Sequence, residues 1–121
     1  MKLLAIDTSQ AAVAACIMGD DGSILARETL PMARGHAEAL LPLIERVAKA
    51  AALPFSALDR IAVVVGPGSF TGIRIGIAAG RAIGLAAGIP VVGVSSLAAF
   101  AAPLIGREGV GVIAAAVDAK H

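Results

Sequence analysis

The spacing of apolar residues changes along the chain, and that change predicts the order of its strands and helices. Apolar or alternating runs cover residues 3–7, 11–18 and 23–29, and short polar turns at 8–10 and 19–22 separate them. Strands joined by such short turns pair with each other, so these runs predict an antiparallel meander of three strands.

The rest of the chain alternates between helical and extended patterns. Apolar residues three and four positions apart predict a helix over residues 36–52, in which Pro42 requires a late start near 39–41 or a kink. The elements expected after it are a strand over 61–65, a helix to about 87, a strand over 91–94, a short helix over 96–104 and a strand over 110–117. This order predicts an α/β fold: a mixed sheet of about five strands, antiparallel at one side and parallel at its centre, with about three helices.

Glycines recur at every fourth position of the second long helix. Residues four apart lie on nearly the same side of an α-helix, so these glycines form a bare stripe that winds slowly around it. Each interior glycine costs about 0.5–1 kcal/mol relative to alanine. Such a helix must therefore pack closely against the chain's own sheet, another helix or a partner protein. The glycines of the stripe are Gly72, Gly76, Gly80, Gly84 and Gly88.

The loop before this helix is rich in glycine. It contains Gly66, Gly68, Ser69 and Thr71, and a strand–loop–helix of this kind can offer free backbone N–H groups to a phosphate. The loop lacks the Lys-Ser/Thr end of a P-loop. A tight turn in which Ser69 or Thr71 caps the helix is the alternative explanation.

A second candidate phosphate turn follows the first strand at Asp7, Thr8 and Ser9. In sugar kinases and actin-like ATPases, an acidic residue at this turn handles the metal–phosphate end of ATP, and a glycine lets the backbone approach the phosphate. Thr8 and Ser9 replace that glycine here, so an Asx-type turn that closes a hairpin explains these residues equally well.

Charge and composition exclude several classes of protein. The net charge is +1 without a basic run, which argues against autonomous binding of nucleic acid. Residues 82–106 carry no charge, but the segment Gly88-Ile89-Pro90 interrupts them, so we do not interpret them as a membrane span. A lone Cys16 indicates a reducing cytoplasm. No second His, Cys or cluster of acidic residues lies at the spacing of metal ligands from His36, and no two residues have the spacing of a catalytic nucleophile and its base.

Four segments resemble the bacterial TsaB (YeaZ) family: AIDTS at 5–9, HAEALLP at 36–42, GPGSFTGIRIG at 66–76 and GVSSL at 93–97. The resemblance covers essentially the whole chain. It implies an actin-like/hexokinase-like (ASKHA), ribonuclease H-like fold in which residues 1–121 form the N-terminal lobe and the C-terminal lobe is absent. It also implies a role in making N6-threonylcarbamoyladenosine (t6A) beside the anticodon of tRNA.

The resemblance further implies a subunit without catalytic activity or cofactor. In this family TsaB is the partner of its paralogue TsaD, the transferase, and an ATPase, TsaE, joins them, so tRNA would be met only through the complex. The catalytic paralogue carries two metal-binding histidines in a Gly-Val-Asn-His-x-x-x-His pattern, and Ser96 and Phe100 stand in their places here. We therefore expect no transferase, peptidase or ATPase activity from this chain alone.

The same resemblance implies that the two long helices pair with those of a partner, as a homodimer in isolation and with TsaD in the cell. We expect Gly76 and Gly80 at the helix crossing, with Arg74 and Arg81 towards the rim. The alternative is that the glycine stripe packs only on the chain's own sheet, and both packings can hold together because the stripe winds around the helix. The expected interface residues are His36, Leu40, Gly72, Ile73, Arg74, Gly76, Ile77, Gly80, Arg81 and Gly84.

Two other functions remain open at this point. One is a small-molecule kinase or ATPase lobe of the same fold, which would need a phosphate turn that admits phosphate. The other is a peptidase, a label that the wider family once carried, which would need a nucleophile–base pair or a metal site.

Overall fold

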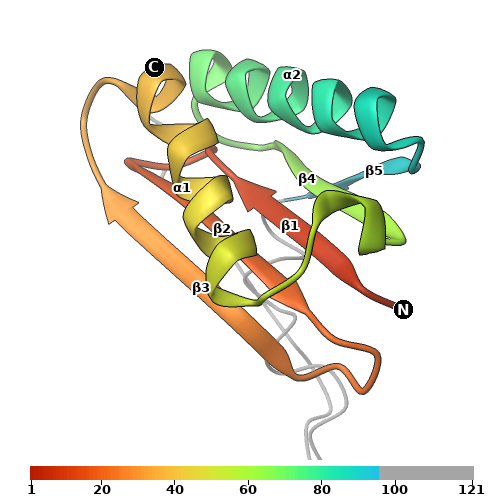
Figure 1. The fold of residues 1–121 in the computed structure, drawn as a ribbon. Helices are drawn as coiled ribbons and strands as arrows, with labels where there is room; N and C mark the ends of the chain where they lie inside the picture. The colour runs from red at the N-terminus through yellow and green to blue at the C-terminus, as the bar shows by residue number, and fades with distance from the viewer. Residues whose placement is uncertain (96–121) are drawn as a thin grey trace, which may run out of the picture.

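A computed structural model describes residues 1–95, and the helix expected over 96–104 and the strand expected over 110–117 lie outside them. Five strands form one mixed sheet in the order β3-β2-β1-β4-β5 (Figure 1). The strands are β1 (Leu3–Asp7), β2 (Ala12–Met18), β3 (Ile24–Pro31), β4 (Arg60–Gly66) and β5 (Val91–Ser95). β1, β2 and β3 pair antiparallel, whereas β4 pairs parallel with both β1 and β5. The predicted meander with a parallel centre is confirmed.

Two α-helices, α1 (His36–Ala50) and α2 (Phe70–Ala87), lie on the same side of the sheet (Figure 1). A short 3-10 helix, η1 (Phe55–Ala57), precedes β4. α1 begins at His36, so Pro42 lies inside the helix rather than at a late start. Ser69 caps the start of α2, and its side chain accepts the N–H of Gly72 at 3.2 Å. Gly88 caps the end of α2 in the left-handed conformation (φ 71°) common at helix ends.

The hydrophobic core lies between this helical layer and the sheet. Alternate residues of β1, β2 and β4 point towards the helices, as the period of a strand requires. α1 supplies large side chains to the core, but α2 meets the sheet mostly with glycine. The fully buried side chains of the core include Leu4, Ile6, Val13, Ile17, Leu40, Leu43, Ile44, Ile61 and Val63.

Glycines on the inner side of α2 let the helix rest directly on β4, on β5 and on the turn after β1. A Cβ atom at Gly76 would lie 2.5 Å from Oγ1 of Thr8, one at Gly80 would lie 2.5 Å from Cγ2 of Val63, and one at Gly84 would lie 2.6 Å from Cγ2 of Val91. A Cβ atom at Gly72 would overlap the carbonyl oxygen of Thr8.

These contacts correct the expectation that Gly76 and Gly80 mark the crossing with a partner helix. Both glycines are buried, together with Gly72 and Gly84, and what faces each of them is the chain's own sheet or the turn after β1. The alternative weighed above, in which the stripe packs on the domain itself, describes these four positions.

Candidate functional site

The turn after β1 is closed by its own side chains. Thr8 and Ser9 are each 1% exposed. Oδ1 of Asp7 accepts two hydrogen bonds from Ser9, one from the backbone N–H at 2.9 Å and one from the hydroxyl at 2.6 Å. The turn is therefore of the Asx type, which was the alternative to phosphate binding that the sequence predicted.

The glycine-rich loop packs against that turn and is hydrogen-bonded to it. The N–H of Ser69 donates to the carbonyl of Ser9 at 2.8 Å, and the hydroxyl of Thr8 donates to the carbonyl of Gly72. A Cβ atom at Gly68 would overlap the backbone of Ser9, so only glycine allows this approach. We call the group Thr8, Ser9, Gly68, Ser69 and Gly72 the clasp.

The clasp brings together most of the residues predicted for a phosphate turn, but it uses their polar groups internally. The N–H groups of Ser9, Ser69 and Gly72 each have an acceptor within the chain. Among the described residues, no buried side-chain nitrogen or oxygen lacks a partner. Gly66 has a φ of +126° beside this group, where glycine is favoured, and Thr71 is exposed. These hydrogen bonds and close contacts connect the end of β1 to the start of α2.

The two helices begin side by side around an open hollow of about 310 Å³. His36 lies at the start of α1, and its Nε2 atom is 3.2 Å from the carbonyl oxygen of Gln10. Residues from both helix starts line the hollow: Ala33, Arg34, Gly35, His36, Ala37 and Glu38 from one, and Ser69, Thr71, Gly72 and Ile75 from the other.

Large apolar side chains stand on the solvent side of the helical layer. Phe70 is 73% exposed, Leu85 is 87% exposed and Leu41 is 49% exposed. Arg74 lies over the Phe70 ring, with its guanidinium carbon 5.4 Å from the ring centroid. We call this surface the outer helical face and define it by Leu41, Phe70, Arg74, Ala78, Arg81 and Leu85.

The structure divides the residues predicted for a partner interface into three groups. Leu40 is 1% exposed, so its place is the chain's own core, and the prediction of an interface role for it is wrong for the same reason as for the glycines. His36, Ile73 and Ile77 are half-buried. Arg74 and Arg81 are exposed.

Sequence reasoning missed the three large apolar residues of the outer helical face. The signal was present for α2, because positions about half a helical turn from the stripe point away from it: Phe70 lies two residues before Gly72, and Leu85 lies nine residues after Gly76. Arg74, Ala78 and Ala82 occupy such positions, and all three are exposed. For Leu41 no such signal was present in the sequence, because it stands three residues before Ile44 and so fits the apolar period of α1, yet it is 49% exposed.

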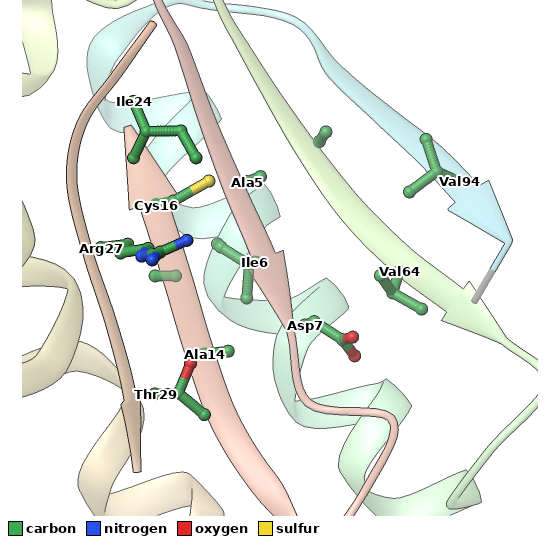
Figure 2. A pocket seen from close by; sticks show the side chains of 12 residues that line it. Ala5, Ile6, Asp7, Ala14, Cys16, Ile24, Arg27, Thr29, Val64 and Val94 are labelled. Atoms are coloured by element: carbon green, nitrogen blue, oxygen red, sulfur yellow. The ribbon is translucent and has the colours of Figure 1, made fainter. Parts of the chain in front are cut away.

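The opposite face of the sheet carries small side chains and a second hollow of about 310 Å³ (Figure 2). In Figure 2, Cys16 and Ala14 of β2 lie beside Arg27 and Thr29 of β3, with the helices on the far side of the sheet. The described residues that line the hollow are Ala5, Ile6, Asp7, Ala14, Ala15, Cys16, Ile24, Arg27, Thr29, Ala62, Val64 and Val94.

Burial raises the pKa of the Cys16 thiol above its ordinary value, while the positive charge of Arg27 and a hydrogen bond with the backbone of Ala5 act in the opposite direction. Only the thiolate is nucleophilic, so a raised pKa lowers its reactive fraction at a given pH. We expect iodoacetamide to alkylate the native chain with a rate that rises at higher pH than in the urea-unfolded chain. Mass spectrometry of timed samples measures this rate.

Removal of the Arg27 charge should move the alkylation profile further towards alkaline pH. Arg27→Gln is the test, and Arg60→Gln, at an exposed arginine of β4, is its matched control. A native profile that coincides with the unfolded one would show that the sheet does not shield the thiol.

Neither a metal centre nor a strong membrane signal emerges from residues 1–95. Within this range, no group of three or more His, Cys, Asp or Glu side chains could hold a metal ion. α2 is the one described helix long and apolar enough to cross a membrane, by length and composition alone. Its buried glycine side packs on the sheet, as expected of a helix that belongs to a folded domain.

Comparison with solved structures defines the class of fold. The ROK hexokinase from Thermus thermophilus aligns with a TM-score of 0.57 and 26% identity, over 88% of this chain and 38% of that one. YeaZ from Pseudomonas aeruginosa aligns with a TM-score of 0.78 and 34% identity, over 90% of this chain and 52% of that one. The chain therefore has an ASKHA-like α/β fold.

Comparison of sequences narrows this class to a family. The family model for TsaD, tRNA N6-adenosine threonylcarbamoyltransferase, matches residues 24–121. The tRNA threonylcarbamoyladenosine biosynthesis protein TsaB of Escherichia coli is 34% identical over 121 residues, which is 99% of this chain and 51% of that protein. The chain belongs to the TsaB/YeaZ family, and it spans about half the length of the curated relatives it matches.

Proposed function

We propose that the chain is the N-terminal part of a TsaB-type subunit that supports t6A formation on tRNA without catalysing it. The observation that carries this proposal is the clasp, in which the chain's own groups fill the turn where a kinase of this fold would admit phosphate. Thr8 and Ser9 are each 1% exposed, and three nearby N–H groups are already bonded. A subunit whose phosphate turn is closed can contribute by binding a partner.

The partners of this subunit are a TsaD-like paralogue and a TsaE-like ATPase, and tRNA is met through their complex. The outer helical face is the surface we assign to the paralogue, because it exposes Phe70 and Leu85 beside arginines, and large apolar and arginine side chains are typical of interface centres. The free thiol of Cys16 is compatible with a cytoplasmic complex.

A kinase or ATPase lobe is the second candidate, because a solved hexokinase shares the fold. It requires that a nucleotide reach the turn after β1. The clasp opposes this, since a phosphate there would have to displace both the Ser9 hydroxyl from Asp7 and the Ser69 N–H from Ser9.

A binding assay with the purified TsaD-like paralogue of the same organism tests the proposal. We expect Leu85→Glu to weaken binding more than about tenfold, because it places a charge in an apolar contact. Leu25→Glu is the matched control, since Leu25 is also exposed (43%) but lies on β3, away from the helices. Calorimetry or surface plasmon resonance measures the affinity, and circular dichroism checks that each variant is folded.

Two results would contradict the proposed function. One is a chain that binds the paralogue equally well with and without the Leu85→Glu change, which would remove the outer helical face as the partner surface. The other is ATP turnover by the chain alone that Asp7→Ala abolishes, which would favour the kinase or ATPase lobe.

A further inference from the structure

Strand β4 is buried on both of its faces, although both described α-helices lie on one side of the sheet (Figure 1). Ile61 and Val63 point towards the glycines of α2. Ala62 and Val64 alternate with them and line the hollow on the opposite side. Ala62 is 8% exposed and Val64 is 4% exposed. Parallel strands that are buried on both faces have a covering layer on each side. The side of the sheet opposite α1 and α2 is therefore expected to carry a second layer.

The smallest side chains on that side form one row across three strands. Ala5 of β1 lies opposite Cys16 of β2 and opposite Ala62 of β4 in the strand register. A row of small side chains leaves a shallow groove, and an element with larger apolar side chains can fill it to the density of a protein interior. We call this surface the second face of the sheet and define it by the following residues of the hollow: Ala5, Ala14, Cys16, Ala62, Val64 and Val94 (Figure 2).

The chain continues from the edge of this sheet with an uncharged segment. β5 is the edge strand and ends at Ser95, and no charged residue follows it until Arg107. A helix that is apolar on all sides is suited to a buried place. The spacing i, i+3, i+4, i+7 of one helical side recurs within the helix expected over 96–104, and its members are Leu97, Phe100, Ala101 and Leu104.

This segment is long enough to cross the second face. β5 and β2 are three places apart in the sheet, which is about 14 Å at the usual spacing of strands. A helix over residues 96–104 would be about 13.5 Å long. Leu97, Phe100 and Leu104 would then bring large side chains to the row of alanine and cysteine, and packed layers combine large with small residues in this way.

We propose that residues 96–104 are the layer that covers the second face, with the helical side of Leu97, Phe100, Ala101 and Leu104 against the sheet. This inference does not rest on the proposed function, because it needs neither the TsaD-like paralogue nor tRNA. Cys16 is the single cysteine of the chain and lines the covered hollow, so its thiol reports whether the segment is in place.

Aspartate on either side of the segment tests this docking. Ala101→Asp places a carboxylate on the side that faces the sheet. Ala99→Asp is the matched control, because position 99 lies about 200° around the helix from position 101. A buried carboxylate opposes docking, so Ala101→Asp should raise the rate at which iodoacetamide alkylates Cys16 at constant pH by at least about tenfold, and Ala99→Asp should leave it unchanged. Mass spectrometry measures the rate, and circular dichroism checks that each variant is folded.

Disulfide trapping provides a second measurement, which decides the question if Ala101→Asp does not fold. Each single substitution to cysteine over residues 97–104 adds one possible partner for Cys16. A disulfide requires Cα atoms about 4.4–6.8 Å apart, so glutathione disulfide should link Cys16 to a position on the side that faces the sheet, such as Phe100→Cys or Ala101→Cys. Ala99→Cys should stay unlinked. Mass spectrometry without reductant detects the link.

Several outcomes would overturn this inference and leave the proposed function intact. Equal alkylation rates in the two folded aspartate variants, or the absence of a disulfide at every position, would show that the segment does not lie on the second face. A rate that falls as the concentration of the chain rises would assign this face to a second copy. A rate that falls only when the TsaD-like paralogue is added would assign it to that partner. Conversely, paralogue binding that ignores Leu85→Glu contradicts the proposed partner surface alone.

Discussion

Leucine in place of Gly72 is expected to destabilise the fold by about 3 kcal/mol or more. Adding atoms to a packed core usually costs about 1–3 kcal/mol, and the cost is at the upper end of this range where the added atoms meet rigid backbone. A Cβ atom at this position overlaps the carbonyl oxygen of Thr8, which is backbone and cannot rotate away. The gain of about 0.5–1 kcal/mol from removing a helical glycine does not offset this overlap. Urea denaturation followed by circular dichroism measures the free energy of unfolding.

A matched substitution on the same helix controls for the added side chain. Ala86→Leu places the same leucine at an exposed position of α2, where the stability should change by less than about 0.5 kcal/mol. Gly76→Leu and Gly80→Leu should follow Gly72→Leu, because their added atoms meet Thr8 and Val63. A Gly72→Leu chain as stable as the unchanged one would mean that α2 does not rest on the turn after β1.

Valine in place of Thr8 is expected to cost about 1–3 kcal/mol, the penalty for leaving a buried polar group without its partner. Valine keeps the shape of threonine but cannot donate a hydrogen bond to the carbonyl of Gly72, to which the Thr8 hydroxyl is bonded. The first turn of α2 would then have a carbonyl without this donor. Urea denaturation again provides the measurement.

Two further variants identify the source of this effect. Thr8→Ser keeps the hydroxyl and should cost less than Thr8→Val. Thr29→Val is the control, because Thr29 is exposed on β3 and a strand accepts either β-branched residue. If Thr8→Val and Thr29→Val have the same small effect, the hydroxyl of Thr8 does not hold β1 to α2.

Most element boundaries within residues 1–95 could be predicted from local patterns. β1 was expected at 3–7 and lies at Leu3–Asp7, and the second helix ends at Ala87 as predicted. The strand alternation and the glycine at position 88 are local signals, so no tertiary information was needed. β3 extends to Pro31, further than the predicted 29, because it continues to pair with β2.

The surface against which the glycine stripe packs could not be predicted in the same way. A bare helical side fits a sheet and a partner helix equally well, and the choice depends on a contact between residues 64 positions apart, Thr8 and Gly72. Leu40 is a different case. It belongs to the same apolar side of α1 as Leu43, Ile44 and Val47, so the helical period already indicated its burial.

The contact of α2 with the sheet mostly through glycine has a mechanical consequence. Where large side chains separate two layers, rotamer changes can absorb a displacement of one layer before the other moves. Between α2 and the strands beneath Gly76 and Gly80, the helix backbone itself touches Thr8 and Val63. Close-packed contacts of this kind transmit strain. We therefore expect a force applied to Arg74 or Leu85 to reach β4 and the turn after β1 across one helix diameter, so that α2 and the strands beneath it move as one stiff body.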